Sequence, residues 1–215
     1  MTEVLAADPL WVRRVEDRSA APDLVDRILD AAVTLVSRWG VAKTTLADVA
    51  KVAGCSRATL YRTFPGGKAA LLDALARREL RTQFGLVVDA VDAADDLADA
   101  ATRALVVASR LVRDHEAVQY LLAHEPGVLL SYLGFRQGDP LYSLVASVVG
   151  PHFARFVAPD RAAWLAEWLT RTLLTYVFEP AGQVDLSSID DARRIVERYL
   201  LPAFPASTSP IVHPA

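Results

Sequence analysis

The sequence has few of the features that mark secreted, membrane or disulfide-bonded proteins. Cys55 is the only cysteine among 215 residues, which excludes a disulfide framework and a zinc site built from cysteines. The longest stretches without charge, 140–154 and 199–215, are interrupted by prolines, and a membrane span needs roughly 20 mostly apolar residues. Acidic residues precede the first arginines and no apolar block follows. We therefore expect no secretory signal and a cytoplasmic protein.

Motifs of nucleotide-binding and hydrolytic enzymes are also missing from the sequence. Gly66-Gly67 before Lys68 lacks the other glycine and the Ser/Thr of a phosphate-binding loop, and no Gly-x-Ser-x-Gly run occurs. His115 and His124 are nine residues apart, a spacing that places them on opposite faces of a helix. We expect no enzyme activity, no metal site and no cofactor.

The charged residues are unevenly distributed along the chain. The net charge of −3 alone argues against a nucleic-acid partner. Residues 22–84, however, contain ten basic and six acidic residues, whereas residues 85–215 contain ten basic and sixteen acidic ones. Such an asymmetry indicates a nucleic-acid-binding module joined to a second, acidic part.

The hydrophobic pattern is helical throughout. Apolar residues recur at spacings of three and four, as in Leu24, Ile28 and Leu35, and no segment alternates with a period of two. The pattern predicts an all-α fold with breaks at Gly40, 53–55, 65–67, Pro126-Gly127 and 136–140. The expected helices span residues 22–39, 46–52, 56–63, 68 onward, 97–113, 116–122, 141–157, 160–178 and 189–201.

Two of the short predicted helices form a helix-turn-helix pattern. The first is 46–52, the turn is 53–55, and the second is 56–63, with Gly54 in the turn supplying a position that needs a positive φ. Thr45 with Asp48, and Ser56 alone, are N-cap signals for these helices. Guanidinium and hydroxyl groups on the outer face of the second helix suit base edges and phosphates. These outward residues are Arg57, Thr59, Tyr61 and Arg62.

The run TTLADVAKVAGCSRATLYRTFPGGKAALLDAL, 44–75, resembles the DNA-binding domain of the tetracycline-repressor (TetR/AcrR) family of bacterial regulators. The resemblance covers roughly residues 22–80. Its matching features are Gly40, Thr45, Asp48-Val49-Ala50, Ala53-Gly54, Ser56, Leu60-Tyr61, Phe64, Lys68 and Leu71-Leu72. Two features depart from the family pattern: Cys55 stands where a valine is usual, and the spacing from Phe64 to Lys68 is one residue longer than is common.

The resemblance implies DNA-binding roles for six residues. The phosphate contacts are Thr45, Tyr61 and Lys68. The residues that face the major groove are Ser56, Arg57 and Thr59. Arg57 is the residue we expect to read a base directly, because arginine to guanine is the commonest specific contact. Lys68 stands at the N-terminus of the fourth helix, where the dipole favours an anion.

The sequence pattern and the resemblance together imply a domain organisation. A flexible arm, 1–21, precedes the helix-turn-helix domain, 22–67, a helical effector-binding and dimerisation domain, 68–204, and a disordered tail, 205–215. The helix predicted over 160–178 has two apolar faces, which require two partners, a core and a second subunit. A homodimer would present two recognition helices to palindromic double-stranded DNA. Arginines of the arm could reach a neighbouring minor groove.

The middle helices are expected to enclose a pocket for a lipophilic small-molecule effector. Apolar and aromatic residues with a few polar tips are the candidates for its wall. They are Tyr120, Leu121, His124, Tyr132, Phe135, Tyr142, Phe153, Trp168 and Tyr176.

The leading hypothesis is therefore a ligand-responsive transcriptional repressor that is released from its operator by the effector. Two alternatives remain open on the sequence: a regulator that answers to a protein partner, and an architectural protein indifferent to DNA sequence. A buried void would favour the small molecule, and a filled core would favour the protein partner.

Overall fold

The computed structural model describes residues 23–133, 140–179 and 182–204, and these residues form α-helices and no strand. The prediction of an all-α fold is therefore confirmed. The predicted arm, 1–21, and tail, 205–215, lie outside the described residues. The helices are α1 (Leu24–Lys43), α2 (Leu46–Val52), α3 (Arg57–Thr63), α4 (Gly67–Asp92), α5 (Leu97–Asp114), α6 (Glu116–His124), α7 (Pro126–Leu133), α8 (Pro140–Val148), α9 (Gly150–Phe153), α10 (Pro159–Phe178) and α11 (Ile189–Ile195).

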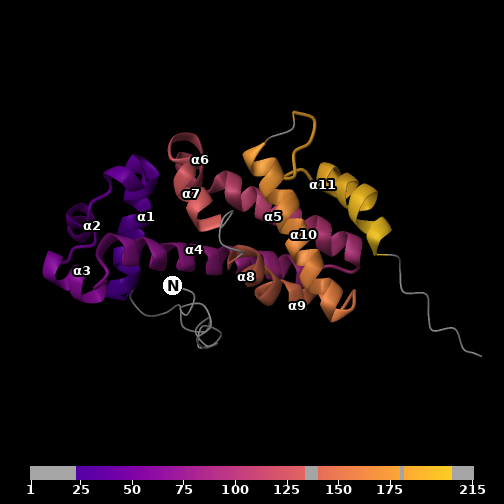
Figure 1. Ribbon diagram of the computed structural model, residues 1–215, viewed down its shortest axis with the longest axis horizontal. Coiled ribbons are helices and arrows are strands. Elements are labelled where there is room, and N and C mark those ends of the chain that lie inside the picture. Colours follow the sequence, from indigo (N-terminus) through magenta and orange to yellow (C-terminus); the bar gives the residue numbers. More distant parts are fainter. Residues whose placement is uncertain (1–22, 134–139, 180–181, 205–215) are drawn as a thin grey trace, which may run out of the picture.

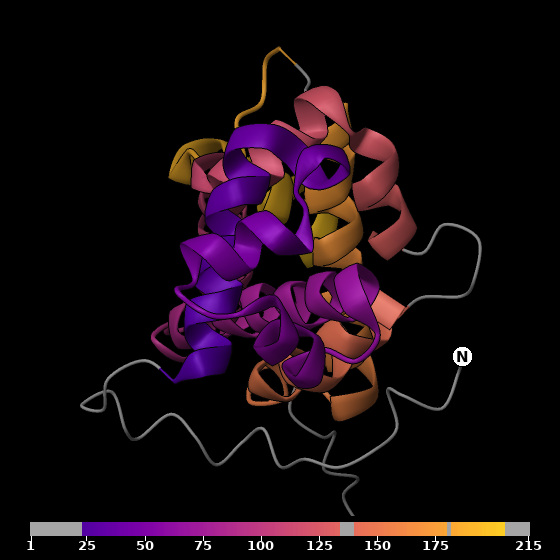
Figure 2. The same cartoon turned by 90° about the vertical axis from the view of Figure 1, so that its left-hand side faces the viewer.

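The molecule is elongated, with α1, α2 and α3 at one end and α5, α8, α9, α10 and α11 at the other (Figure 1). The long helix α4 runs from the first group into the second. Seen from the α1–α3 end, the later helices lie behind these three (Figure 2). One helix thus belongs to both parts of the protein.

Four predicted boundaries differ from the structure. The first helix resumes after a kink at Gly40, whose φ of 78° is not helical, and ends at Lys43. Pro126 begins α7 instead of breaking the chain, because proline suits the first helical position. The helix expected over 141–157 is divided into α8 and α9. The last helix changes after Ile195 into a π-helical turn, Val196–Leu200, and a 3-10 turn, Leu201–Ala203.

The N-terminal part has its own hydrophobic core. Ile28 and Ala32 of α1, Val49 of α2, Leu60 of α3 and Leu71 of α4 are almost completely buried and pack together. These residues come from the inner faces that the three-and-four spacing predicts. The core fixes the orientation of α3 relative to α1 and α4.

A second core holds the larger part together. Val91 of α4, Leu105 of α5, Phe153 of α9 and Leu165 of α10 are fully buried in one cluster with residues of α11. A small third cluster joins the two parts, where Val36 of α1 packs on α6. No helix within the described ranges is long and apolar enough to cross a membrane.

Gly54 offers a direct test of the helix-turn-helix backbone. Its φ is 66°, and a Cβ added there would meet no atom within 4 Å. We expect Gly54→Ala to lower the free energy of unfolding by about 1–2 kcal/mol, because only the left-handed backbone penalises the methyl group. Chemical denaturation would measure it.

Gly85→Ala is the matched control for this substitution. Gly85 lies in α4 with equally open space around its Cα but without a positive φ. There alanine should stabilise the protein by about 0.5–1 kcal/mol. Equal effects at the two positions would contradict the assignment of the turn.

Candidate DNA-binding surface and ligand cavity

The starts of α2 and α3 are fixed by side-chain caps. Thr45 Oγ1 accepts a hydrogen bond from the Asp48 amide at 3.2 Å and donates one to the Asp48 carboxylate at 2.5 Å. Ser56 Oγ accepts from the Thr59 amide at 3.0 Å and lies 2.9 Å from Thr59 Oγ1. The capping predictions for Thr45 and Ser56 are thus confirmed. These hydroxyls satisfy amides that the helix leaves unpaired.

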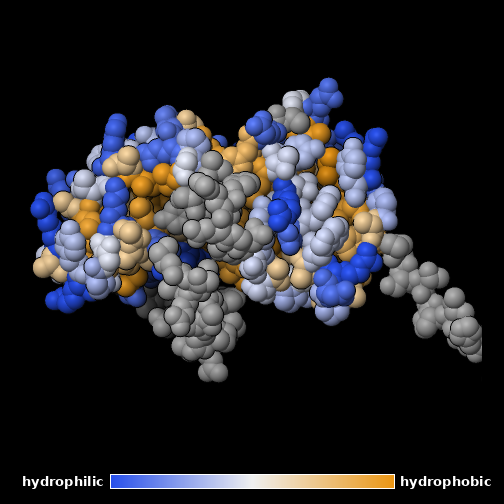
Figure 3. Space-filling model, in the orientation of Figure 1, coloured by the Kyte–Doolittle hydropathy of each residue, from blue (hydrophilic) through white to orange (hydrophobic). Residues whose placement is uncertain are grey.

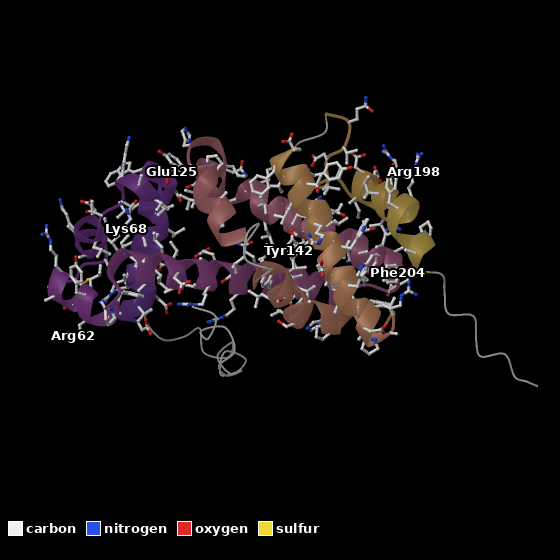
Figure 4. All side chains as sticks on the ribbon, in the orientation of Figure 1. Arg62, Lys68, Glu125, Tyr142, Arg198 and Phe204 are labelled. Carbon is white, nitrogen blue, oxygen red and sulfur yellow. The ribbon has the colours of Figure 1, made fainter. Side chains whose placement is uncertain are left out.

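Four of the six predicted phosphate and base contacts lie together on one surface. Thr45, Arg57, Tyr61 and Lys68 line the same shallow depression between α2, α3 and the start of α4. Ser56 and Arg57 are exposed at the beginning of α3, and the Tyr61 side chain is 52% exposed. Arg62 projects at the same end of the molecule (Figure 4). We call this the α3 surface; its basic and hydroxyl groups are those that phosphate and base edges bind.

Lys68 has a second set of contacts that the sequence did not indicate. Its Nζ donates to the carbonyl oxygens of Val41 at 2.6 Å and Ala42 at 3.3 Å, at the end of α1. An ammonium group has three N–H donors, so two carbonyl partners leave one for another acceptor. Lys68 therefore joins the α3 surface to the end of α1.

Glu125 holds the same two residues from the other side. Its carboxylate accepts hydrogen bonds from the Val41 amide at 3.0 Å and the Ala42 amide at 3.2 Å. Glu125 stands between α6 and α7, in the larger part of the molecule, and lies above Lys68 in Figure 4. We call residues 40–44 the α1 corner. The amides and the carbonyls of Val41 and Ala42 are thereby bound by two side chains that are distant in sequence, Glu125 and Lys68.

Gly40 makes this contact with Glu125 possible. A Cβ at this position would clash with the Glu125 carboxylate and with the Tyr120 ring. Its positive φ also turns the chain so that the next two amides face α6. The sequence pattern marked Gly40 only as a helix end.

A cavity of about 250 Å³ lies inside the larger part of the protein. It is lined by residues of α4, α5, α6, α7, α8, α9 and α10. Its lining is dominated by aliphatic and aromatic side chains, and α4 contributes Leu80, Phe84 and Val87 from one face. Lining of this kind suits an apolar ligand.

Of the predicted cavity residues whose side chains the structure describes, one lines the observed cavity. Phe153 lines the cavity, whereas Tyr120, Leu121, His124, Tyr142, Trp168 and Tyr176 do not. Tyr120 stacks on His124 with ring centroids 4.4 Å apart beside the α1 corner, and Leu121 packs against α1. Tyr142 lies under the guanidinium of Arg171. Phe135 is outside the described residues, and the side chain of Tyr132 is not described.

Aromatic type was a poor guide because aliphatic residues form most of the wall. The spacing of Leu80, Phe84 and Val87 on α4 was the available signal, since it places the three on one face. The sequence pattern also does not predict that Glu79, His115 and Gln83 line the cavity. A histidine–carboxylate pair 36 residues apart leaves no local pattern.

Glu79 lies at the polar end of the cavity and is engaged on both oxygens. His115 Nε2 is 3.2 Å from one oxygen, and the Arg78 guanidinium donates to the other at 3.0 Å. The hydrogen bond with His115 is the main cause that lowers the pKa of Glu79, and Arg78 adds to it against the opposing effect of burial. Arg78 also bonds Asp30 of α1 at 2.7 Å. The cavity and the first helix are thus joined by a chain of polar contacts.

An exposed capped helix behind a tight turn, together with a separate helical part that holds a cavity, defines a helix-turn-helix regulator that binds DNA. Comparison with known proteins identifies the family of regulators to which the chain belongs. The model for bacterial regulatory proteins of the tetR family matches residues 28–75. The helix-turn-helix-type transcriptional regulator Rv1255c of Mycobacterium tuberculosis H37Rv is 33% identical over 162 residues, covering 69% of this chain and 74% of that protein.

Solved structures share the fold. The TetR family repressor AlkX from Dietzia sp. superposes with a TM-score of 0.63 and 22% identity, over 83% of this chain and 95% of that one. The fatty acid degradation regulator FadR from Bacillus halodurans gives a TM-score of 0.54 at 15% identity, over 84% and 98%.

The chain belongs to the TetR family of bacterial transcriptional regulators. Members of this family are DNA-binding regulators of transcription. This protein is therefore a DNA-binding regulator and not an enzyme. The resemblance that the helix-turn-helix residues indicate is confirmed.

The lowered pKa of Glu79 predicts how its contribution to stability depends on pH. A carboxylate with a depressed folded pKa stabilises above its unfolded value, here 4.5, and loses this effect as pH falls through the folded pKa. We expect Glu79→Gln to lower the free energy of unfolding by about 1 kcal/mol at pH 7. The difference from wild type should shrink below pH 4.5.

Urea denaturation at pH 7 and at lower pH would measure this difference. Asp89→Asn on the same helix is the control, because Asp89 is exposed and has no ion pair within the described residues. A wild-type advantage that is the same at both pH values would contradict the pairing of Glu79 with His115 and Arg78.

Proposed function

We propose that this protein is a homodimeric repressor of transcription that binds a palindromic operator and is released from it by a lipophilic small molecule. A regulator of bacterial genes acts where the chromosome lies, in the cytoplasm. The α3 surface is the observation that carries the proposal, because it unites Thr45, Arg57, Tyr61 and Lys68 at one end of the molecule.

On the α3 surface, different residues would contact the bases and the phosphates. Arg57 is exposed in the first turn of α3 and would enter the major groove together with Ser56 and Thr59. Tyr61 and Thr45 flank the depression. The Tyr61 hydroxyl would donate to a phosphate there, and the Thr45 hydroxyl would do so by turning away from the Asp48 carboxylate, to which it donates in this structure. The Lys68 ammonium would supply its remaining donor to the same phosphate.

The proposed subunit contact is at the opposite end of the protein. Trp164 on α10, Ile189 on α11 and Tyr199 after it are 48%, 50% and 58% exposed. Trp164 packs on Phe204 with ring centroids 5.4 Å apart, so the apolar face spans both segments. Phe204 and Arg198 lie far from Arg62 in Figure 4. Large exposed apolar residues on neighbouring helices are typical of an interface with a second subunit.

The effector would occupy the cavity. An apolar cavity of this kind supports a small molecule over a protein partner as the signal, since a protein partner needs no cavity. The neighbour AlkX is described as implicated in biodegradation of n-alkanes, and FadR as a regulator of fatty acid degradation. Both descriptions concern apolar chains, which is the chemistry that the lining suits.

The α1 corner would carry the signal between the two sites. A ligand that displaces α6 or α7 moves Glu125, and Glu125 is bonded to the amides of Val41 and Ala42. Lys68 binds the carbonyls of the same residues and lines the α3 surface. Ligand and operator would then favour different positions of one corner, which couples their affinities reciprocally.

Two substitutions separate base reading from phosphate binding on the α3 surface. We expect Arg57→Ala to cost roughly 1–3 kcal/mol of discrimination at one or two base positions. Lys68→Ala should weaken binding to all sequences alike and reduce the salt slope by about one. The assay is a fluorescence anisotropy titration on the intergenic DNA beside its own gene, at several salt concentrations and with random DNA as competitor.

Arg103→Ala is the control for both variants, since Arg103 lies on α5 and pairs with Asp99 away from the α3 surface. It should leave affinity and salt slope unchanged. If random DNA competes equally with the best site, the protein is architectural and the proposal of an operator fails. An unchanged salt slope in Lys68→Ala would show that this lysine serves the α1 corner alone.

Introducing a negative charge into the proposed dimer surface tests the subunit contact. Trp164→Glu or Tyr199→Glu should raise the dimer dissociation constant at least about thirtyfold, because a carboxylate would be buried without a partner. Leu86→Glu, on an equally exposed apolar position of α4, is the control and should leave association unchanged. Sedimentation equilibrium measures all three; a wild-type monomer would refute the interface.

A further inference from the structure

One polar side-chain atom of the cavity wall has no hydrogen-bond partner in the part of the chain that the structure describes. Gln83 Oε1 is buried and accepts no hydrogen bond, and it is the one such side-chain atom among the described residues. Gln83 lies on α4 one turn after Glu79, on the face that lines the cavity. A buried carbonyl oxygen without a donor is costly, so a group that donates to it gains more than an exposed hydrogen bond would.

The other polar groups of the cavity wall are already engaged. Glu79 is bonded by His115 and Arg78, and the His115 ring is used at both nitrogens, since Nδ1 accepts from the Val118 amide at 3.4 Å. Thr170 Oγ1 donates to the Ala166 carbonyl at 2.8 Å. Gln83 is therefore left as the group that can fix the orientation of a ligand.

The charge of the wall limits the ligand further. No lysine or arginine is among the described residues that line the cavity, and the carboxylate among them, Glu79, carries negative charge. A carboxylate bound there would be buried with no lysine or arginine on the wall to pair with, because the nearby Arg78 guanidinium is already engaged by Glu79. An anionic amphiphile is thus disfavoured, whereas a neutral molecule is not.

From these observations we propose that the effector is an uncharged molecule with an apolar body and one terminal hydroxyl, which donates its proton to Gln83 Oε1. Gln83 is then the residue that sets specificity for an alcohol over an ether, a hydrocarbon or a fatty acid. The inference rests on the proposed function, because it assumes that the cavity is the effector site.

Isomeric probes test the hydroxyl directly. 1-Octanol and 1-methoxyheptane have the same atoms, but only the alcohol donates a hydrogen bond; octanoate adds the anion. Each is titrated calorimetrically into full-length wild type and Gln83→Leu, and the homologues of six to twelve carbons are included. We expect the alcohol to bind wild type about threefold to tenfold more tightly than the ether. Octanoate should bind more weakly than both.

Gln83→Leu should abolish the difference between alcohol and ether while it keeps binding of the ether. Leucine matches the apolar wall, and Gln83→Met serves if the leucine variant does not fold. Thr170→Val is the control, because the Thr170 hydroxyl is bonded within its own helix and should leave the preference intact.

The possible failures are distinguishable. If no neutral probe of any length binds, the cavity is not a lipophilic site and the proposed effector fails together with this inference. If alcohol and ether bind wild type equally, if the preference survives in Gln83→Leu, or if octanoate binds best, the inference is wrong. The lipophilic cavity then stands without it.

Discussion

The hydrogen bonds from the amides of Val41 and Ala42 to the Glu125 carboxylate constrain how the end of α1 is placed against the larger part of the molecule. These bonds join the junction of α6 and α7 to the end of α1. Val41 and Glu125 are 84 positions apart in sequence. Gly40 is required for these bonds, and Lys68 completes the contact from the carbonyl side. A charged acceptor on two neighbouring amides is stronger than a neutral one, so the corner is a defined contact.

Helix α4 is the second element that both parts share. Its first residues complete the α3 surface, its middle carries Arg78 and Glu79, and Gln83 and Phe84 follow in the cavity wall. A helix is a regular connection between its two ends because its backbone hydrogen bonds are internal. The polar chain from His115 through Glu79 and Arg78 to Asp30 is therefore a second connection beside Glu125.

The sequence predicted the local features well and the long-range ones poorly. The caps at Thr45 and Ser56, the turn at Gly54 and the inward Leu60 follow from neighbouring residues, and the structure confirms them. The pairing of Glu125 with the α1 corner, the second role of Lys68 and the cavity wall depend on how helices pack, which spacing within one helix does not encode. The prediction of the cavity wall favours aromatic residues, but Tyr120 stacks on His124 and Tyr142 lies under Arg171 instead. The helical spacing is predicted correctly, and the type of residue that lines the cavity is not.

The most direct test of this account compares wild type with Glu125→Ala for their response to ligand. Operator affinity is measured with and without saturating 1-octanol, on the DNA each protein selects from a random pool, after unfolding curves show that both are folded. Wild type should lose affinity about fivefold or more with the ligand, and Glu125→Ala should lose less than about twofold. Glu125→Gln, which keeps an acceptor oxygen, should fall between them. An equal loss in all three proteins would contradict the claim that the α1 corner couples the two sites.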